Sequence, residues 1–389
     1  MSEHPYKSLP DRAFWKRSVA GIEPSQIDPV GEVPFRIART DKVATAGSCF
    51  AQHISRRLSE SGYTFLVTEP AHPIADPADA QEFNYGVFTA RYGNVYTARQ
   101  LVQLLERAYG TFQPQEDAWE GEDGRLIDPF RPQIQPGGFR TQREYDVDRA
   151  KHLAAVREAF ETADVFIFTL GLTEAWMSQE DGAVYPLCPG VAGGTFDESR
   201  YRFHNFTAAE VTVDLLRFID ELRRVNPAVR VVLTVSPVPL MATATDQHVL
   251  TATSYSKAVL RVAADQAVAA RADVLYFPSY EIVMGTFARG AYFEGDLRSV
   301  TEAGVNHVMR TFFRRLGEDQ ADAAPVARVV PPPAENHLER MARAAALNCD
   351  EEALDRSRPE QSRIESRGAE QPRTEEPRVT VVPRRRRHI

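Results

Sequence analysis

The chain has few cysteines. Its 389 residues contain only three, Cys49, Cys188 and Cys349, which lie far apart in the sequence. Structural zinc sites and the disulfide frameworks of secreted domains need cysteines at paired spacings, so the sequence indicates neither. This usage is typical of a reducing compartment, and we expect no metal and no other tightly bound cofactor.

Long apolar runs and an excess of positive charge are also missing. No stretch approaches the roughly 20 apolar residues of a membrane span, and residues 1–7 lack the basic and then apolar pattern of a secretion signal. We therefore expect a cytoplasmic protein without a transmembrane segment. The net charge of -8 argues against a nucleic-acid partner, because phosphate binding needs clustered positive charge.

The chain does contain apolar strand patterns that alternate with helical ones, and 43% of its residues are apolar. Strands are predicted at residues 43–46, 64–68, 165–170, 229–235 and 274–277. Helices are predicted at residues 51–61, 97–108, 147–162, 208–225, 254–271 and 301–316. This alternation predicts an α/β fold, in which helices cover both faces of a parallel sheet.

The same patterns predict three parts. Residues 1–40 form an N-terminal arm that packs on the core through Phe14, Trp15 and Phe35, and residues 41–317 form the α/β domain. A loop insertion at about 112–146 is either a lid or specificity surface or a passive excursion. Residues 318–389 read as a linker, a short helix at 335–348 and a disordered tail. The arginines at its end could meet an anionic partner or lipid, or could simply be solvated.

The first strand leads into a turn that carries two nucleophilic side chains. Gly47, Ser48 and Cys49 separate the strand from a helix that has Ile54 and Leu58 one turn apart. The unpaired N–H groups at a helix N-terminus favour a thiolate or a developing oxyanion. The competing interpretation is structural: the glycine makes the turn, the serine caps the helix and the cysteine is buried.

Other loops should meet this turn. In a parallel sheet, ligands bind at the carboxyl ends of the strands. Residues 171–173 follow the third predicted strand, residues 236–237 follow the fourth, and the loop at 293–299 precedes the last helix. The sequence therefore predicts one site at this edge of the sheet.

Residues 47–51 spell Gly-Ser-Cys-Phe-Ala, and further blocks occur at 84–87, 92–94, 169–176, 203–206 and 234–239. In this content and order the chain resembles the GSCFA family, which is distantly similar to the SGNH (GDSL-type) esterases and acetyltransferases. The resemblance implies a flavodoxin-like three-layer sandwich of the SGNH-hydrolase type.

The resemblance also suggests the nucleophile. A gapless overlay of residues 47–49 on the GDS pattern puts Cys49 at the nucleophile, and a shift by one puts Ser48 there. A thiol at a helix N-terminus needs no adjacent base, which favours Cys49 slightly.

The resemblance also implies which residues bind the oxyanion and the substrate, and all of them lie within these blocks. They are Gly47, Gly86, Asn94, Gly171, Thr173 and Glu174. Thr173 stands where the family pattern GxND has its asparagine. Structurally, the glycines could only make turns, and Thr173 and Glu174 could only cap a helix.

The last block departs from the SGNH pattern. An Asp-x-x-His is expected there, but the chain has Asp296 followed by Ser299, so the usual base is missing. His307 and His204 are the alternative bases, and each could be purely structural. Arg298 could bind a substrate carboxylate or phosphate, or pair with Asp296.

The resemblance to the SGNH esterases and acetyltransferases implies an acyl esterase or O-acyltransferase that acts on a small-molecule or glycan acyl ester, such as an envelope-glycan precursor. Trp119, Trp176 and Tyr292 could stack on sugar rings. The alternative is a non-catalytic binding or scaffold protein that keeps the pocket without the Asp-x-x-His base.

Overall fold

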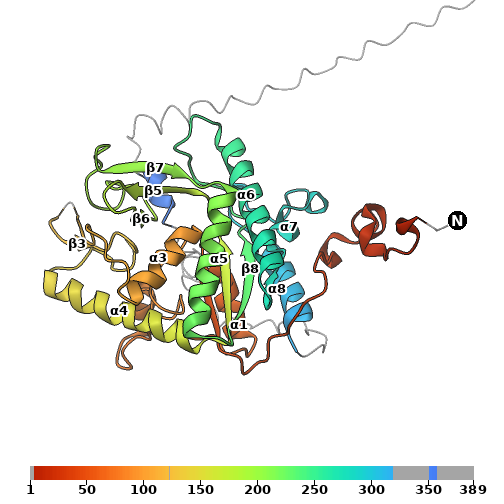
Figure 1. Ribbon diagram of the computed structural model, residues 1–389, viewed down its shortest axis with the longest axis horizontal. Coiled ribbons are helices and arrows are strands. Elements are labelled where there is room, and N and C mark those ends of the chain that lie inside the picture. Colours follow the sequence, from red (N-terminus) through yellow and green to blue (C-terminus); the bar gives the residue numbers. More distant parts are fainter. Residues whose placement is uncertain (1–3, 122, 319–349, 357–389) are drawn as a thin grey trace, which may run out of the picture.

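The computed structural model describes residues 4–121, 123–318 and 350–356 (Figure 1). Its centre is a parallel sheet in the order β1-β4-β8-β9. The strands are β1 (Val43–Gly47), β4 (Val165–Leu170), β8 (Arg230–Val235) and β9 (Val274–Tyr276). Nearly all of their side chains are buried, as expected for a sheet covered on both faces.

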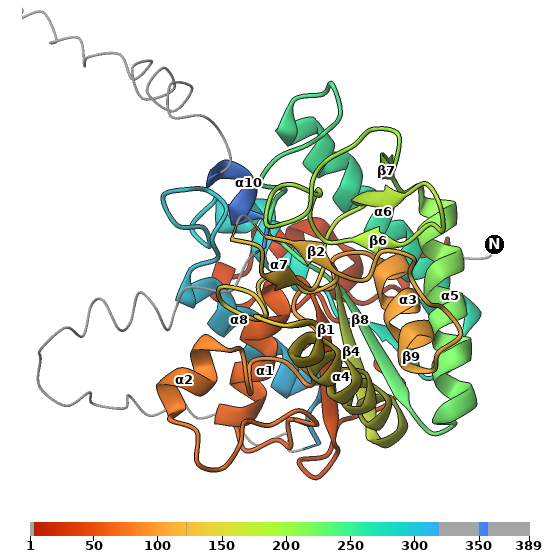
Figure 2. The same ribbon diagram turned by 90° about the vertical axis from the view of Figure 1, so that its left-hand side faces the viewer.

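Helices cover both faces of this sheet, which confirms the predicted α/β fold. Phe166, Phe168 and Leu170 of β4 pack into one apolar core, and Val165 and Ile167 pack into the other. The first core includes α3 (Ala98–Ala108), α4 (Gln142–Thr162), α5 (Ala208–Val225) and α6 (Val249–Ala270). The second includes α1 (Phe50–Glu60), α7 (Ser279–Met284) and α8 (Glu302–Leu316). Figure 2 shows the strands between α1 and α8 on one side and α3 and α5 on the other.

Side-chain caps fix where the helices begin. Thr97 and Thr207 form capping boxes at the starts of α3 and α5, which therefore begin close to their predicted positions. Helices α4 and α6 begin earlier than predicted, because Thr141 and His248 accept hydrogen bonds from the N–H groups of Glu144 and Leu250. The first turn of α4 is polar, and the first turn of α6 carries the exposed Leu250, so neither turn shows the periodic burial pattern.

The structure differs from the prediction in its smaller β elements. The strand predicted at 64–68 is only an isolated bridge between Phe65 and Val43. An unpredicted antiparallel sheet has the order β6-β5-β7. Its strands are β5 (Glu174–Ser178), β6 (Val184–Tyr185) and β7 (Tyr201–Asn205). Glu174 therefore begins a strand, and the predicted helix cap at this position is wrong.

The predicted loop insertion carries little regular structure of its own. It contains the short hairpin of β2 (Trp119–Glu120) and β3 (Leu126–Ile127), and α4 begins within it. Further short helices are α2 (Pro77–Glu82) and the 3-10 turn η5 (Thr286–Ala288), and the N-terminal arm contains η1 (Pro5–Lys7), η2 (Asp11–Ala13), η3 (Lys16–Ala20) and η4 (Pro24–Gln26).

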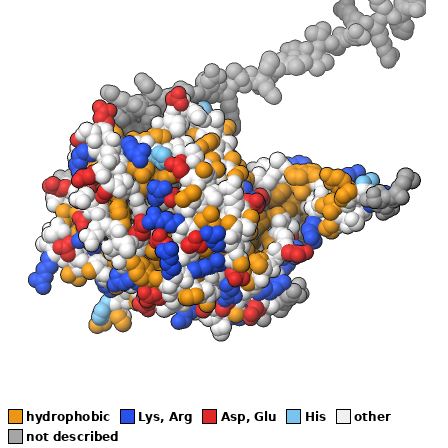
Figure 3. Space-filling view, viewed as in Figure 1, with side chains coloured by type: hydrophobic (Ala, Val, Ile, Leu, Met, Phe, Trp, Pro, Cys, Tyr) orange, Lys and Arg blue, Asp and Glu red, His pale blue; other side chains and the backbone are white. Residues whose placement is uncertain are grey.

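The N-terminal arm packs on the core only in its second half. Ile27, Val30 and Ile37 are buried, and Phe35 contacts the apolar core around α8. The preceding residues project away from the domain (Figure 3), and Trp15 is 67% exposed. The prediction that Trp15 anchors the arm is therefore wrong. Within the described ranges, no helix is long and apolar enough to cross a membrane.

A short C-terminal segment returns to the domain. Asp350 and Glu351 are buried, and α10 (Glu352–Arg356) follows them (Figure 2). We expected the whole tail after residue 348 to be disordered, so the structure differs at this segment. The predicted linker, the helix at 335–348 and the terminal arginines lie outside the described residues.

Candidate active site

The turn after β1 is held against the end of β4. Gly47 has a φ of 141°, and a Cβ atom there would lie 2.3 Å from the carbonyl oxygen of Thr169. The N–H of Ser48 donates a hydrogen bond to the same carbonyl at 3.1 Å. Only glycine fits this close approach, so Gly47 fixes the positions of the two residues that follow.

Ser48 and Cys49 are both buried where β1 passes into α1. Cys49 is the N-cap residue of α1 and makes no side-chain capping hydrogen bond; the N–H groups of Ala51 and Gln52 donate to the carbonyls of Ser48 and Cys49. Ser48 is 3% exposed, and its Oγ has no hydrogen-bond partner among the described residues. A buried hydroxyl without a partner costs stability, which is typical of a site that waits for a ligand.

Both residues line a small cavity of about 10 Å³ at the carboxyl ends of the strands. Its walls are Ser48, Cys49, Tyr96, Gly171, Leu172, Ser236, Val238, Pro239, Leu240, Lys257 and Glu351. Three of the four predicted loops thus meet at one cavity. The fourth reaches its edge through Arg298, whose Nε donates to the carbonyl of Pro239 at 3.2 Å.

Sequence reasoning missed Lys257 of α6. Its side chain is 2% exposed, and its Nζ donates to the Gly171 carbonyl at 2.6 Å. Burial lowers the pKa of Lys257 to about 8; Glu351 and Cys49 act against this shift, and Arg298 adds to it. A lysine that is partly neutral near pH 8 can serve as a base. A signal was present, because Lys257 shares the buried face of α6 with Thr253 and Leu260.

The GSCFA family model matches residues 42–312, which is most of the chain. The chain belongs to the GSCFA family. This confirms the resemblance, and the turn at residues 47–51 lies within the match.

No curated protein matches this GSCFA chain. Among solved structures, an acetyl xylan esterase from the rumen bacterium Butyrivibrio proteoclasticus is similar at 12% identity with a TM-score of 0.22. The alignment covers 64% of this chain and 57% of that one.

The structure does not bring either predicted histidine of this GSCFA protein to the cavity. The Nδ1 of His307 is 2.8 Å from the Tyr292 hydroxyl, and its Nε2 is 2.7 Å from the Ile27 carbonyl. His204 lies in β7, where its Nε2 is 2.8 Å from Glu210. Both imidazoles are thus engaged elsewhere, and we do not assign either as the base.

The loop at residues 293–299, which stands in place of the Asp-x-x-His block, is held by hydrogen bonds between its own residues. Asp296 accepts hydrogen bonds from the N–H groups of Arg298 and Ser299 and from the Ser299 hydroxyl. The side chain of Arg298 does not pair with Asp296; it forms an ion pair with Glu351 at 2.8 Å. Asp296 and Ser299 thus shape the loop that carries Arg298 to the edge of the cavity.

The predicted oxyanion donors after β4 are engaged in other bonds. The N–H of Gly171 donates to the Tyr96 carbonyl at 3.0 Å. The hydroxyl of Thr173 donates to Asn205 at 2.6 Å, and the carboxylate of Glu174 accepts from Thr243. Of these three predicted residues only Gly171 lines the cavity, where it supplies the carbonyl that holds Lys257.

The other two predicted donors differ from each other. Gly86 is exposed and has a φ of 75°, as a turn glycine does. Asn94 is buried; its Oδ1 accepts from Gln52 at 3.2 Å and its Nδ2 donates to Asp350 at 3.1 Å. Asn94 therefore binds Asp350, the residue before the cavity residue Glu351.

The described residues contain no cluster of His, Cys, Asp or Glu suited to a metal ion. The cavity instead combines a thiol, a hydroxyl, an amine and a helix N-terminus. These groups suit nucleophilic acyl chemistry.

Proposed function

We propose that this GSCFA protein hydrolyses acyl esters with Cys49 as the nucleophile and Lys257 as its base. The observation that carries the proposal is the common cavity of Ser48, Cys49 and Lys257 at the carboxyl ends of the strands. The Asp-x-x-His base is missing from this chain, and Lys257 supplies a buried amine in its place.

Neutral Lys257 takes the proton of the Cys49 thiol, and the thiolate attacks the acyl carbonyl. The tetrahedral adduct collapses to a thioester while the ammonium of Lys257 returns the proton to the departing alcohol. Water then attacks the thioester, the amine takes the proton of the water, and the acid leaves as the thiol is restored.

The oxyanion needs hydrogen-bond donors that are not used in the resting state. The hydroxyl of Ser48 meets this requirement, because its Oγ is buried without a partner among the described residues. The N-terminus of α1 also favours negative charge through the helix dipole, although the N–H groups of Ala51 and Gln52 already donate to the Ser48 and Cys49 carbonyls. Ser48 thus acts as a donor beside Cys49.

Cys49 suits the role of nucleophile better than Ser48 does. It stands at the N-cap of α1, where a thiolate is stabilised, and it is close enough to Lys257 to affect the pKa of that lysine. A serine hydroxyl is much less acidic and would need a stronger base.

The finer proposal is transfer of the acyl group to a carbohydrate acceptor. Of the three aromatic residues predicted for sugar stacking, Trp119 and Tyr292 are buried. Trp176 of β5 is half-buried and packs against Phe196 and Phe203. If transfer is the reaction, added sugar acceptors will speed release of the alcohol more than water alone does.

The test is hydrolysis of 4-nitrophenyl acetate by the full chain and its variants. Cys49→Ala is expected to reduce the rate to background, and Ser48→Ala to reduce it about 100-fold, as for the loss of an oxyanion donor. Cys188→Ala is the matched control, because this half-buried cysteine lies outside the cavity. Unchanged hydrolysis in Cys49→Ala would refute the mechanism, and its absence from every protein tested would favour the non-catalytic binding module.

A further inference from the structure

Two consecutive carboxylates of the C-terminal segment are buried in the domain, and the second, Glu351, lines the cavity. Asp350 is 4% exposed and Glu351 is 7% exposed, although both follow a long stretch of chain after α8. Asp350 accepts hydrogen bonds from the Nδ2 and the N–H of Asn94. Glu351 pairs with Arg298 at 2.8 Å and accepts from the N–H of Met241.

Glu351 touches the reactive part of the site. It forms part of the cavity wall together with Ser48, Cys49 and Lys257. Its charge acts on the pKa of Lys257, as do those of Cys49 and Arg298. The carboxylate therefore lies between two cationic side chains and beside the proposed nucleophile.

The cations define what can replace this carboxylate. The side chain of Arg298 is 14% exposed and that of Lys257 is buried, so neither is well solvated. Two poorly solvated cations are costly without an anion between them, whereas a carboxylate can accept charge-assisted hydrogen bonds from an arginine. Burial raises the pKa of Glu351, while Arg298 and Lys257 favour its ionised form.

The cavity is also too small for an ester while the segment is in place. Its volume of about 10 Å³ has room for about one water molecule and is far below the roughly 300–1,000 Å³ of typical ligand pockets. Because Glu351 is one of its walls, displacement of the segment would enlarge the cavity on the side of Arg298.

We propose that Arg298 forms a carboxylate-binding site next to Cys49 and Lys257, which takes a carboxylate-bearing acyl ester and which Glu351 occupies in its absence. The ester part of this inference rests on the function proposed above. An anionic substrate would displace Glu351 and take over its contacts with Arg298.

The first test measures access to Cys49 without any enzymatic turnover. Full-length protein is treated with neutral iodoacetamide or anionic iodoacetate, and alkylation of Cys49 and Cys188 is followed by mass spectrometry. Cys188 serves as the internal reference for reagent reactivity. Glu351→Gln keeps the side-chain shape and removes the charge, and Glu352→Gln is the matched control because Glu352 is exposed.

Glu351→Gln is expected to speed the labelling of Cys49 by iodoacetamide about tenfold or more, as for the loss of a hydrogen bond to a charged group. In this variant the labelling rate of Cys49 with iodoacetate should rise about tenfold relative to its labelling rate with iodoacetamide, when both are referred to the rates at Cys188. The further substitution Arg298→Gln should abolish this rise. Asp350→Asn, which weakens the contact with Asn94, should also speed labelling. Equal rates in Glu351→Gln and Glu352→Gln, or no advantage for iodoacetate, would overturn the proposal.

The second test compares 4-acetoxybenzoate with its neutral methyl ester in the Glu351→Gln protein. We expect kcat/KM to favour the carboxylate about tenfold and Arg298→Gln to remove this preference. Hydrolysis without the preference would refute the carboxylate site and leave the esterase proposal standing. Charge-selective labelling without hydrolysis would support the carboxylate site and refute the esterase.

Discussion

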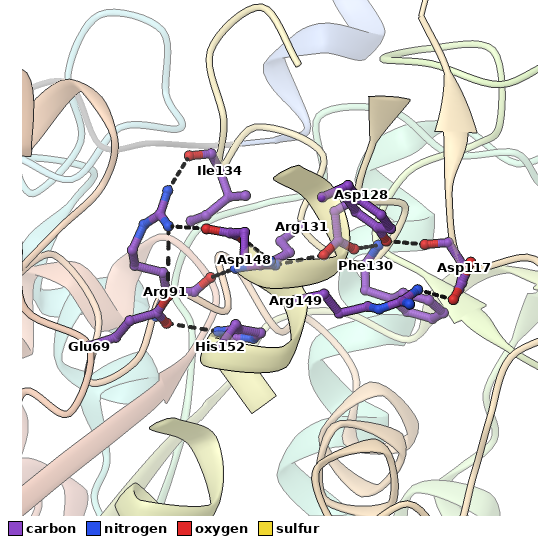
Figure 4. A network of polar contacts seen from close by, with 11 residues as sticks. Glu69, Arg91, Asp117, Asp128, Phe130, Arg131, Ile134, Asp148, Arg149 and His152 are labelled. Carbon is purple, nitrogen blue, oxygen red and sulfur yellow. Dashed lines mark hydrogen bonds and ion pairs between the residues drawn. The ribbon is translucent and has the colours of Figure 1, made fainter. Parts of the chain in front are cut away.

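Two buried polar clusters of this molecule are built differently. One is an arginine network around Glu69, Arg91, Arg131, Asp148 and His152 (Figure 4), and the other is the cavity of Cys49 and Lys257. In the network, each guanidinium is paired with carboxylates from the surrounding elements. In the cavity, as far as the described residues show, the Ser48 hydroxyl has no hydrogen-bond partner, and the carboxylate in the wall, Glu351, comes from a distant segment. One network atom, Oε1 of Glu69, also lacks a hydrogen bond, but it lies 3.6 Å from Nη1 of Arg91. This difference fits the roles that we infer, a structural one for the network and a reactive one for the cavity.

The arginine network ties loops to α4. Arg91 pairs with Asp148 at 3.0 Å and donates to the carbonyls of Phe83 and Ile134. Arg131 pairs with Asp128 at 2.7 Å and also with Asp148. These bonds join the insertion to the domain, so the network has a structural role.

Protonation in the network follows from its pairing. Burial alone would raise the pKa of Glu69, but the His152 hydrogen bond, the Arg131 charge and the Arg91 N–H together lower it to about 2. The Nδ1 of His152 is 2.8 Å from Glu69. Glu69 therefore stays ionised at neutral pH, whereas Lys257 is placed to gain and lose a proton.

The largest expected effect is on stability in the arginine network. Arg131→Met should lower the free energy of unfolding by about 3–5 kcal/mol, because it leaves buried carboxylates without a partner. Asp128 is buried, and the substitution would remove the guanidinium that lies 2.7 Å from its carboxylate. Urea unfolding measures the change. The exposed Arg143→Met serves as control, and an equally small change in both variants would contradict the structural role of the network.

The next effect is on the rate in the cavity. Lys257→Met should lower ester hydrolysis about 100-fold or more, as expected for loss of a general base. Since the neutral amine is the base, the wild-type rate should rise with pH and level off above about 8, following the lowered pKa of Lys257.

The charged groups near Lys257 allow a second pH measurement. Glu351 and Cys49 raise its pKa and Arg298 lowers it. Glu351→Gln should therefore move the midpoint of the rate profile to lower pH. A profile that still rises beyond pH 10, as for an unperturbed lysine with a pKa of about 10.4, would contradict Lys257 as the base.

The smallest effect concerns the unpartnered hydroxyl. Ser48→Ala should leave the unfolding free energy unchanged or raise it by up to about 1 kcal/mol, because it removes a buried polar atom without a partner. Ser236→Ala is the matched control: Ser236 is equally buried, but its Oγ accepts from the N–H of Val238 at 3.3 Å. It should lose about 1 kcal/mol. Equal losses in urea unfolding would mean that the Ser48 hydroxyl is satisfied in solution.

The sequence was sufficient to predict the central sheet and the position of the turn. Continuous apolar runs identify buried parallel strands such as β4, and the glycine before Ser48 indicates a tight turn. Strand β5 was missed because it is only partly buried, so its sequence lacks the continuous apolar run that identifies strands such as β4.

The missed parts of the site depend on contacts between distant residues. Lys257 was overlooked because a charged residue on a helix is usually solvated. Asp350 and Glu351 belong to a polar stretch that resembles a disordered tail, and Asn94 and Asp350 are 256 residues apart in sequence. Local pattern cannot show that such a segment finds buried cationic and amide partners.

The turn at Gly47 has a consequence for how the protein matures. The hydrogen bond that holds Ser48 runs to Thr169 of the neighbouring strand, and the glycine fits only against that strand. Cys49 thus acquires its setting at the same moment as β1 and β4 come together. Loss of Cys49 labelling during refolding would therefore count correctly assembled sheets directly, without a separate structural probe.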